Sequence, residues 1–77
     1  MRDKESEKLA AKIVSELMAV RKERGVSHDK LAEMTGLSRA TISFVENHKR
    51  NPTLITCLKI AKALDVDLAD IMRKGRK

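Results

Sequence analysis

The stretch SHDKLAEMTGLSRATISFVEN, from Ser27 to Asn47, decides the fold of this 77-residue chain. Serine is favoured at the N-cap of a helix, and Ser27 and Ser38 each precede a segment with helical spacing of apolar residues. Gly36 separates the two segments. The pattern therefore predicts a short helix that ends at Gly36, a tight turn, and a second helix from Arg39 to about Asn47.

The second of these helices has two unlike faces. At 100° per residue, Ile42 and Val45 fall on one face. The opposite face carries a different set: Ala40, Ser43, Phe44 and Asn47. Two short helices joined by a turn such as TGLS are typical of a helix-turn-helix motif, whose second helix fits the major groove of DNA with its N-terminal residues at the base edges. Phe44 is the only aromatic residue of the chain, so its outward position raises the question of what it contacts.

Three more helices are expected around this pair. A first helix from Ser6 to Arg24, ending at Gly25, follows from the spacing of four apolar residues: Leu9, Ile13, Leu17 and Val20. Thr53 is expected to cap a fourth helix with a buried stripe made of Leu54, Cys57, Ile60, Ala61 and Leu64. Asp67 is expected to cap a last helix, from Leu68 to about Arg73, that buries Leu68 and Ile71.

The fold class predicted from these segments is all-α. No alternating pattern bounded by hairpin turns indicates a strand. Apolar residues make up 42% of the chain and aromatic residues 1%, which favours small packed helices built on aliphatic side chains. We expect one domain over 1–77, with its core in 9–73 and a flexible tail at 74–77. Met18, Met34 and Met72 are predicted at flanking or half-exposed positions.

The charge indicates an anionic partner. The formal net charge is +6, and the segment 34–64 carries +4 because Glu46 is its only acid. Such a balance favours nucleic acid or a membrane surface, but no apolar run approaches the 18 residues of a membrane span and the N-terminus does not resemble a signal peptide. A single cysteine, Cys57, allows no internal disulfide and is expected to be a small core residue, so we expect a cytoplasmic protein.

The residues do not support an enzyme. Ser27, His28 and Asp29 are consecutive, so their side chains diverge around a helix start and cannot converge as a catalytic relay. Two histidines and one cysteine offer no close pair at metal-ligand spacing, and the three glycines are scattered. We therefore expect no catalysis, no metal and no cofactor.

The chain resembles a known family through five motifs in order: LMAVRKERGVS, LAEMTGLS, ATISFVEN, RNPTL and LKIAKALDV. They are similar to those of Cro and phage-repressor type helix-turn-helix regulators, also called the XRE type, and the resemblance covers Ile13 to Met72. It implies a compact, five-helix, lambda-repressor-like DNA-binding domain. Bare domains of this length resemble restriction-modification controller proteins, small phage repressors and single-domain antitoxins.

The resemblance also implies roles for individual residues. The base-reading positions correspond to Arg39, Ala40, Ser43 and Phe44. The positions that touch or approach phosphates correspond to Ser27, His28, Ser38, Asn47, Lys49 and Arg50. Arg21 and Glu46 match a structural ion pair. For Phe44 three contacts stay open: a thymine methyl group, aliphatic stems of neighbouring helices, or another protein.

Two positions depart from the family pattern. His28 stands where the second helix usually begins with Gln, which puts in doubt the phosphate contact and the brace to the first reading residue that this Gln makes. His48 stands where Gly commonly follows Asn47. Because Gly there serves a positive φ, we expect the predicted helix at Arg39 either to end differently or to carry about 1 kcal/mol of strain.

The function expected from all of this is sequence-specific regulation of transcription. One short helix reads only about four or five base pairs, which is too few to single out a site. We therefore expect a homodimer on an inverted-repeat operator of double-stranded DNA, in a bacterial or phage setting. Candidate interface residues are Ile55, Val66, Leu68, Ile71 and Met72. The alternative is a protein-interaction module, such as an antitoxin bound to its toxin, with DNA binding secondary.

Overall fold

The computed structural model describes residues 3–75, and this part of the chain forms five helices and no strand. The helices are α1 (Lys4–Glu23), α2 (His28–Thr35), α3 (Arg39–Glu46), α4 (Leu54–Ala63) and α5 (Leu68–Gly75). The predicted all-α class and the order of the five helices are confirmed. Among the described residues, no helix combines the length and apolar character that crossing a membrane requires.

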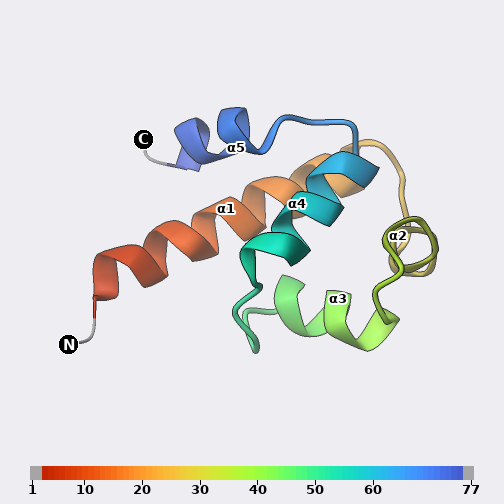
Figure 1. The fold of residues 1–77 in the computed structure, drawn as a ribbon, viewed down its shortest axis with the longest axis horizontal. Coiled ribbons are helices and arrows are strands. Elements are labelled where there is room, and N and C mark those ends of the chain that lie inside the picture. Colours follow the sequence, from red (N-terminus) through yellow and green to blue (C-terminus); the bar gives the residue numbers. More distant parts are fainter. Residues whose placement is uncertain (1–2, 76–77) are drawn as a thin grey trace.

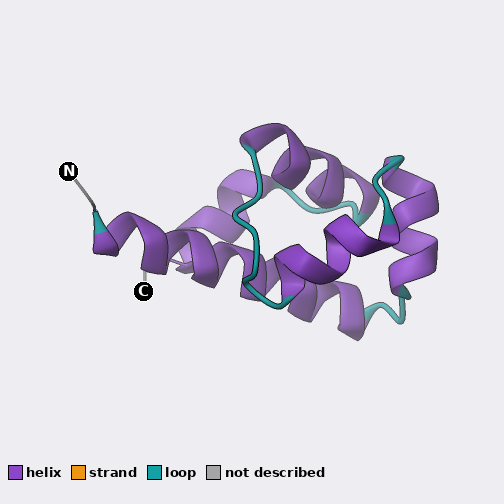
Figure 2. Cartoon of the chain, turned by 90° about the horizontal axis from the view of Figure 1, so that it is seen from below, coloured by secondary structure: helices purple, strands orange, loops and turns teal. Residues whose placement is uncertain are grey.

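The helices are arranged around α1 and α4. Figure 1 shows α5 along one edge of the molecule and α3 along the opposite edge, with α1 and α4 between them and α2 at the end where α1 finishes. Seen from below in Figure 2, α3 and the loops on either side of it face the viewer. The helix predicted to read DNA therefore lies on an outer edge of the fold.

Side-chain caps start each of the four helices after α1. Ser27 Oγ accepts a hydrogen bond from the backbone N–H of Lys30, and Ser38 Oγ accepts one from Thr41, both at 3.0 Å. Thr53 makes the same contact at the start of α4, and Asp67 accepts from the N–H of Ala69 at the start of α5. These four predicted helix starts are confirmed, and each cap satisfies a backbone donor that the helix leaves free.

The core lies where all five helices meet. Its largest fully buried side chains are Leu17, Leu31, Ile42, Val45, Ile60 and Leu64, each at most 2% exposed. The inward face predicted for α3 is confirmed by Ile42 and Val45, and the predicted burial of Leu68 and Ile71 on α5 is also confirmed.

Two details of the predicted core are wrong. In α1 the buried residues are Val14, Leu17, Met18 and Arg21, whereas Leu9, Ile13 and Val20 of the expected stripe are only half-buried. The reason is that α1 packs against α5 as well as against α3 and α4, so its buried face is wider and rotated relative to a single stripe. Met18, predicted to be half-exposed, is 4% exposed for the same reason.

The start of α4 and the end of α5 also differ from the prediction. Leu54 opens α4 and is 66% exposed, and Cys57 is only half-buried, so the buried stripe of that helix begins at Ile60. The hydrophobic pattern predicts the face of a helix but not the point along it where its neighbours stop. The last helix continues to Gly75, so Lys74 and Gly75 are helical rather than part of a flexible tail, and residues 76–77 of that predicted tail lie outside the described residues.

The end of α3 keeps a geometry that glycine usually provides. His48 has a φ of 59°. Its N–H donates to the carbonyl of Val45 at 3.1 Å, and the N–H of Lys49 donates to the carbonyl of Phe44 at 2.8 Å. These two bonds form a Schellman motif, in which the residue with positive φ is most often Gly. Of the two outcomes expected at His48, the structure shows the strained one.

Replacing His48 with glycine should therefore stabilise the protein. We expect the free energy of unfolding to rise by about 0.5 to 1 kcal/mol, because the strain of a side chain in the left-handed region is larger than the extra entropy of glycine in the unfolded chain. Urea unfolding followed by circular dichroism measures this difference.

The matched control is Gly25→Ala, at the equivalent position after α1. Gly25 has a φ of +67° and a Cβ added there would have no heavy atom within 4 Å, so this change isolates the backbone cost. It should destabilise by a similar amount. A His48→Gly protein no more stable than the unaltered chain would show that the His48 side chain compensates for its backbone.

Candidate nucleic-acid interface

The outer face of α3 presents the residues that the sequence predicted for base reading. Arg39, Ala40 and Phe44 are exposed and Ser43 is half-buried. Since Ile42 and Val45 are held in the core, the roll of α3 about its own axis is set, and its opposite face must point outward. Phe44 is 41% exposed, so the only aromatic ring of the chain does lie on this face.

Arg50 packs on this ring. Its guanidinium carbon lies 5.2 Å from the centroid of Phe44, which is within the range of a cation–π contact. The Schellman turn after α3 brings the chain back across the end of the helix. Arg50 therefore lies beside the last turn of α3, which contains Phe44. Lys49 and Arg50 are both exposed, so the end of the predicted reading helix is cationic.

The polar residues predicted to approach phosphates lie mainly at helix ends. Ser27 and Ser38 use their side-chain oxygens as N-caps of α2 and α3. Asn47 follows α3, and its Nδ2 donates to the carbonyl of Ser43 at 2.9 Å. The N-terminus of a helix offers free N–H groups and a partial positive charge, so the starts of α2 and α3 are suited to an anion such as a phosphate.

Behind α3, the carboxylate of Glu46 is surrounded by three basic side chains. Arg21 approaches both of its oxygens through Nη2, at 3.0 and 3.2 Å, and donates through Nη1 to the carbonyl of Val26 at 2.7 Å. His28 donates to Glu46 through Nε2, and Lys22 Nζ lies 3.5 Å from its other oxygen. The predicted ion pair of Arg21 and Glu46 is present, and it ties α1 to α3.

Both members of this pair are largely withdrawn from solvent. Burial alone opposes the ionisation of Glu46, but the hydrogen bonds from His28 and Arg21 outweigh it and hold the pKa of Glu46 below its ordinary value. The only acid of segment 34–64 is therefore ionised and turned away from solvent, and its charge is compensated within the fold.

Two residues in this region were not predicted to have a role. Lys22 joins the Glu46 cluster, and Asp29 lies beside Arg39, with 3.3 Å between its Oδ1 and Arg39 Nε. Both contacts join residues of different helices, and no local pattern marks them. His28, by contrast, was predicted at a phosphate and has its Nε2 occupied by Glu46, so only Nδ1 is left for that contact.

The candidate dimer residues divide into two groups. Ile55 and Met72 are 65% and 42% exposed, and Val66 is half-buried. Leu68 and Ile71 are 8% and 3% exposed, because they fill the core between α5 and α1, so their side chains have little surface left for a second copy. Of the five candidates, these two are therefore the least accessible to a partner.

Cys57 is half-buried, and its burial raises the pKa of the thiol, which disfavours the reactive thiolate. Within residues 3–75, no cluster of three or more His, Cys, Asp or Glu side chains is placed to hold a metal ion.

Comparison with known proteins gives a consistent result. The family model described as helix-turn-helix matches residues 17–71. The chain is 40% identical over 60 residues to the HTH-type transcriptional regulator SutR of Escherichia coli K12, a match that covers 78% of this chain and 34% of SutR. The chain thus spans about a third of the length of that relative.

Two solved structures are similar over most of their length. One is a mutant of the restriction-modification controller protein C.Esp1396I, with a TM-score of 0.81, 29% identity and 90% coverage of both chains. The other is the restriction-modification controller protein C.AhdI of Aeromonas hydrophila, with a TM-score of 0.73 and 35% identity, covering 82% of this chain and 94% of C.AhdI. These relatives are regulators and controllers, and they do not support the alternative expectation of an antitoxin.

Proposed function

Because this chain belongs to the helix-turn-helix family, we propose that it is a sequence-specific, double-stranded-DNA-binding regulator of transcription. One observation carries the proposal most directly. The outward face of α3 is flanked by Arg39, Lys49 and Arg50, while Glu46, the one acid of segment 34–64, is neutralised behind it. A helix presented in this way fits the major groove, and the surrounding positive charge complements the phosphate backbone.

In this proposal Arg39 is the principal base reader. It is the first residue of α3, its side chain is 68% exposed, and a guanidinium can make a bidentate contact to O6 and N7 of guanine. Ala40 and Ser43 lie along the same face of the helix. Phosphate contacts are proposed for Ser27, His28, Ser38, Asn47, Lys49 and Arg50, at the ends of α2 and α3.

Phe44 is proposed to contact a thymine methyl group, the apolar feature of the major-groove edge. The exposure of the ring supports this role, because Phe44 remains 41% exposed with Arg50 packed on it.

The Phe44→Ala change should cost about 1 kcal/mol of binding at the operator carrying that thymine and less at a duplex with another base there. Binding measured on matched duplexes by fluorescence anisotropy gives the difference. Equal weakening on every duplex, or a loss of folding stability, would assign the ring to packing instead.

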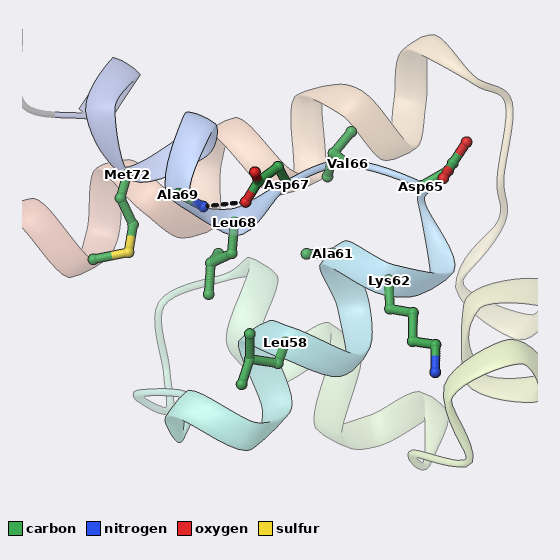
Figure 3. A pocket seen from close by; sticks show the side chains of 9 residues that line it. All are labelled: Leu58, Ala61, Lys62, Asp65, Val66, Asp67, Leu68, Ala69 and Met72. Atoms are coloured by element: carbon green, nitrogen blue, oxygen red, sulfur yellow. Dashed lines mark hydrogen bonds between the residues drawn. The ribbon is translucent and has the colours of Figure 1, made fainter.

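A second copy of the chain is the proposed occupant of the apolar surface formed by α4 and α5. This surface is made of the exposed side chains Leu54, Ile55, Leu58 and Met72. Figure 3 shows Leu58 of α4 and Met72 of α5 pointing into a common groove, with Lys62, Asp65 and Asp67 at its rim. Because the rim carries both a lysine and acids, the lysine of one chain can pair with the acids of a second copy, which suits a self-complementary interface.

The Ile55→Lys change should disrupt this dimer. Ile55 is 65% exposed, so the Ile55→Lys change leaves the core intact while placing a charge in the apolar surface. We expect a tenfold or greater rise in the dimer dissociation constant, measured by sedimentation equilibrium, on the scale of one buried apolar side chain. Met34→Lys is the control, since Met34 is 46% exposed and belongs to α2, outside the apolar surface of α4 and α5. An unchanged dissociation constant in Ile55→Lys would place the interface elsewhere.

Selection of bound duplexes from a randomised pool tests the proposed function. The 77-residue protein is used at two salt concentrations, and the enriched sequences are aligned. An inverted repeat with half-sites about 10 to 11 base pairs apart is expected for a dimer with two reading helices on one face of the DNA. Weak binding that enriches no sequence and disappears as salt rises would contradict a sequence-specific regulator. A regulator of this kind would act on its operator in the cytoplasm of a bacterial cell, as a repressor or a controller.

A further inference from the structure

A carboxylate lies exposed on the cationic face proposed to bind DNA. Asp29 is the second residue of α2, its side chain is 76% exposed, and its Oδ1 lies 3.3 Å from Nε of Arg39 at the start of α3. Such a group repels phosphates, so its presence beside the principal base reader costs affinity. The position of Asp29 within the first turn of α2 accounts for an acid there through the helix dipole, but not for its contact with Arg39.

We propose that Asp29 is a positioning residue that holds Arg39 in the orientation needed to read guanine and limits binding to other sequences. The inference rests on the proposed function, because it assigns a role to a side chain that acts through Arg39.

The geometry of the guanidinium supports this role. Arg39 approaches Asp29 with its Nε, which lies at the side of the planar group. The two terminal nitrogens, Nη1 and Nη2, are then free to form a pair of parallel hydrogen bonds with O6 and N7 of one guanine. An arginine already paired at Nε loses less side-chain freedom when it binds guanine. More of the free energy of that contact is then available to discriminate guanine from other bases.

The neighbouring residue cannot take this role. His28, the first residue of α2, donates to Glu46 through Nε2 and is thereby directed toward the buried ion pair. Asp29 is the next residue, and among the described side chains it is the acid that contacts Arg39. The first two residues of α2 thus have different partners: His28 contacts the buried ion pair, and Asp29 contacts Arg39 of the reading helix.

The charge of Asp29 has a second effect, on binding to DNA without the preferred sequence. On an unrelated duplex Arg39 has no guanine in register and acts only as a positive charge, which the carboxylate partly cancels. On the operator the bidentate contact compensates for the repulsion. Asp29 should therefore lower affinity for all DNA but lower it least for the correct site.

The test compares Asp29→Asn and Asp29→Ala with Glu33→Gln, which removes one acid from the same helix. Glu33 pairs with Lys30, and its side chain is 73% exposed. Dissociation constants are measured for the selected operator, for the same operator with the Arg39-dependent guanine pair replaced in both half-sites, and for an unrelated duplex. The Arg39-dependent pair is the one whose replacement weakens the unaltered protein but not Arg39→Ala.

Both Asp29 variants should bind the unrelated duplex more tightly. Their preference for the operator over its guanine-replaced form should fall by about 5-fold or more, on the scale of one bidentate contact. Glu33→Gln should keep the preference of the unaltered protein. In the free protein, the Asp29 variants should also shift the Arg39 Nε–H resonance, which reports the contact without any DNA.

Two results would overturn the role of Asp29. The first is an unchanged guanine preference in Asp29→Ala together with equally tighter binding to all three duplexes, which would make Asp29 a simple charge. The second is an unchanged Arg39 Nε–H resonance in both variants. An unaltered protein without preference at any base pair overturns the proposed function itself, and it is distinguished from the other two because it appears before any variant is made.

Discussion

Replacing Glu46 with alanine should lower the free energy of unfolding by about 3 kcal/mol, a large share of the stability of a domain of this size. The change leaves Arg21, only 9% exposed, without the carboxylate that neutralises it. We expect a cost at the lower end of the range for buried pairs, because the side chains of Arg21 and Glu46 keep 11% and 14% of their exposure. Urea unfolding of the free protein measures the difference.

The control for this change is Glu33→Ala. The pair of Glu33 and Lys30 has a similar distance of 3.0 Å but side chains 73% and 60% exposed, so its loss should cost less than about 0.5 kcal/mol. The double change Arg21→Met with Glu46→Leu should recover most of the stability, since it removes both charges together. A Glu46→Ala protein within 1 kcal/mol of the unaltered chain would contradict a scaffold role for the pair.

The cluster around Glu46 should also affect how the free energy of unfolding falls at acidic pH. The pKa of Glu46 is lower in the folded protein than its ordinary value of 4.5, so the folded state binds fewer protons there than the unfolded state. Its contribution is complete above that ordinary value and is lost as the pH falls through the lower folded pKa. Glu46→Gln should flatten the fall in stability as the pH drops below about 5. Urea unfolding at several pH values measures this.

Local patterns were sufficient to predict the five helices and the starts of the four that follow α1. The start of α1 was placed too late: it begins at Lys4, with Asp3 as its N-cap, and not at Ser6. Ser27, Ser38 and Thr53 each act through a bond to the third residue of the following helix, so their effect is visible within a few positions of sequence. The positive φ at Gly36, 77°, is equally local. The roll of α3 followed from its short amphipathic period, because its apolar residues Ile42 and Val45 lie on one face and both are buried.

Burial on the longer helices was harder to predict. Met18 is buried on a helix, α1, that packs against α5 as well as against α3 and α4, and the position of α5 depends on how the chain returns after α4. Leu54 fits the apolar period of α4 but lies beyond the end of its packing. A period describes one helix, whereas burial depends on where other helices end.

In the candidate site, too, some contacts were predicted from the sequence and others were not. The resemblance indicated the pair of Arg21 and Glu46, which the structure contains. It did not indicate the contact of Asp29 with Arg39, since nothing in the spacing of two polar residues ten positions apart predicts a contact across a turn. Contacts between side chains on different helices depend on their rotamers as well as on the fold, so they require the three-dimensional structure.

Removing the Arg39 side chain should abolish most of the sequence preference while leaving the fold intact. Arg39 is 68% exposed and its one described ion pair is with the exposed Asp29, so the Arg39→Ala protein should unfold within about 0.5 kcal/mol of the unaltered chain. Its affinity for the operator should fall by about 1 to 3 kcal/mol per half-site, because the bidentate contact to guanine is lost. Affinity for an unrelated duplex should change much less.

Lys49→Ala is the matched change for this comparison. Lys49 is exposed beyond the end of α3 and is proposed to meet a phosphate, so its loss should weaken binding to every duplex alike and reduce the salt slope by about 1 per chain. Anisotropy titrations of both variants on the operator and on an unrelated duplex, at three salt concentrations, separate the two effects. If Arg39→Ala weakened both duplexes to the same degree, Arg39 would be a phosphate ligand like Lys49, and the reading of bases would have to come from the middle of α3, where Ser43 and Phe44 lie.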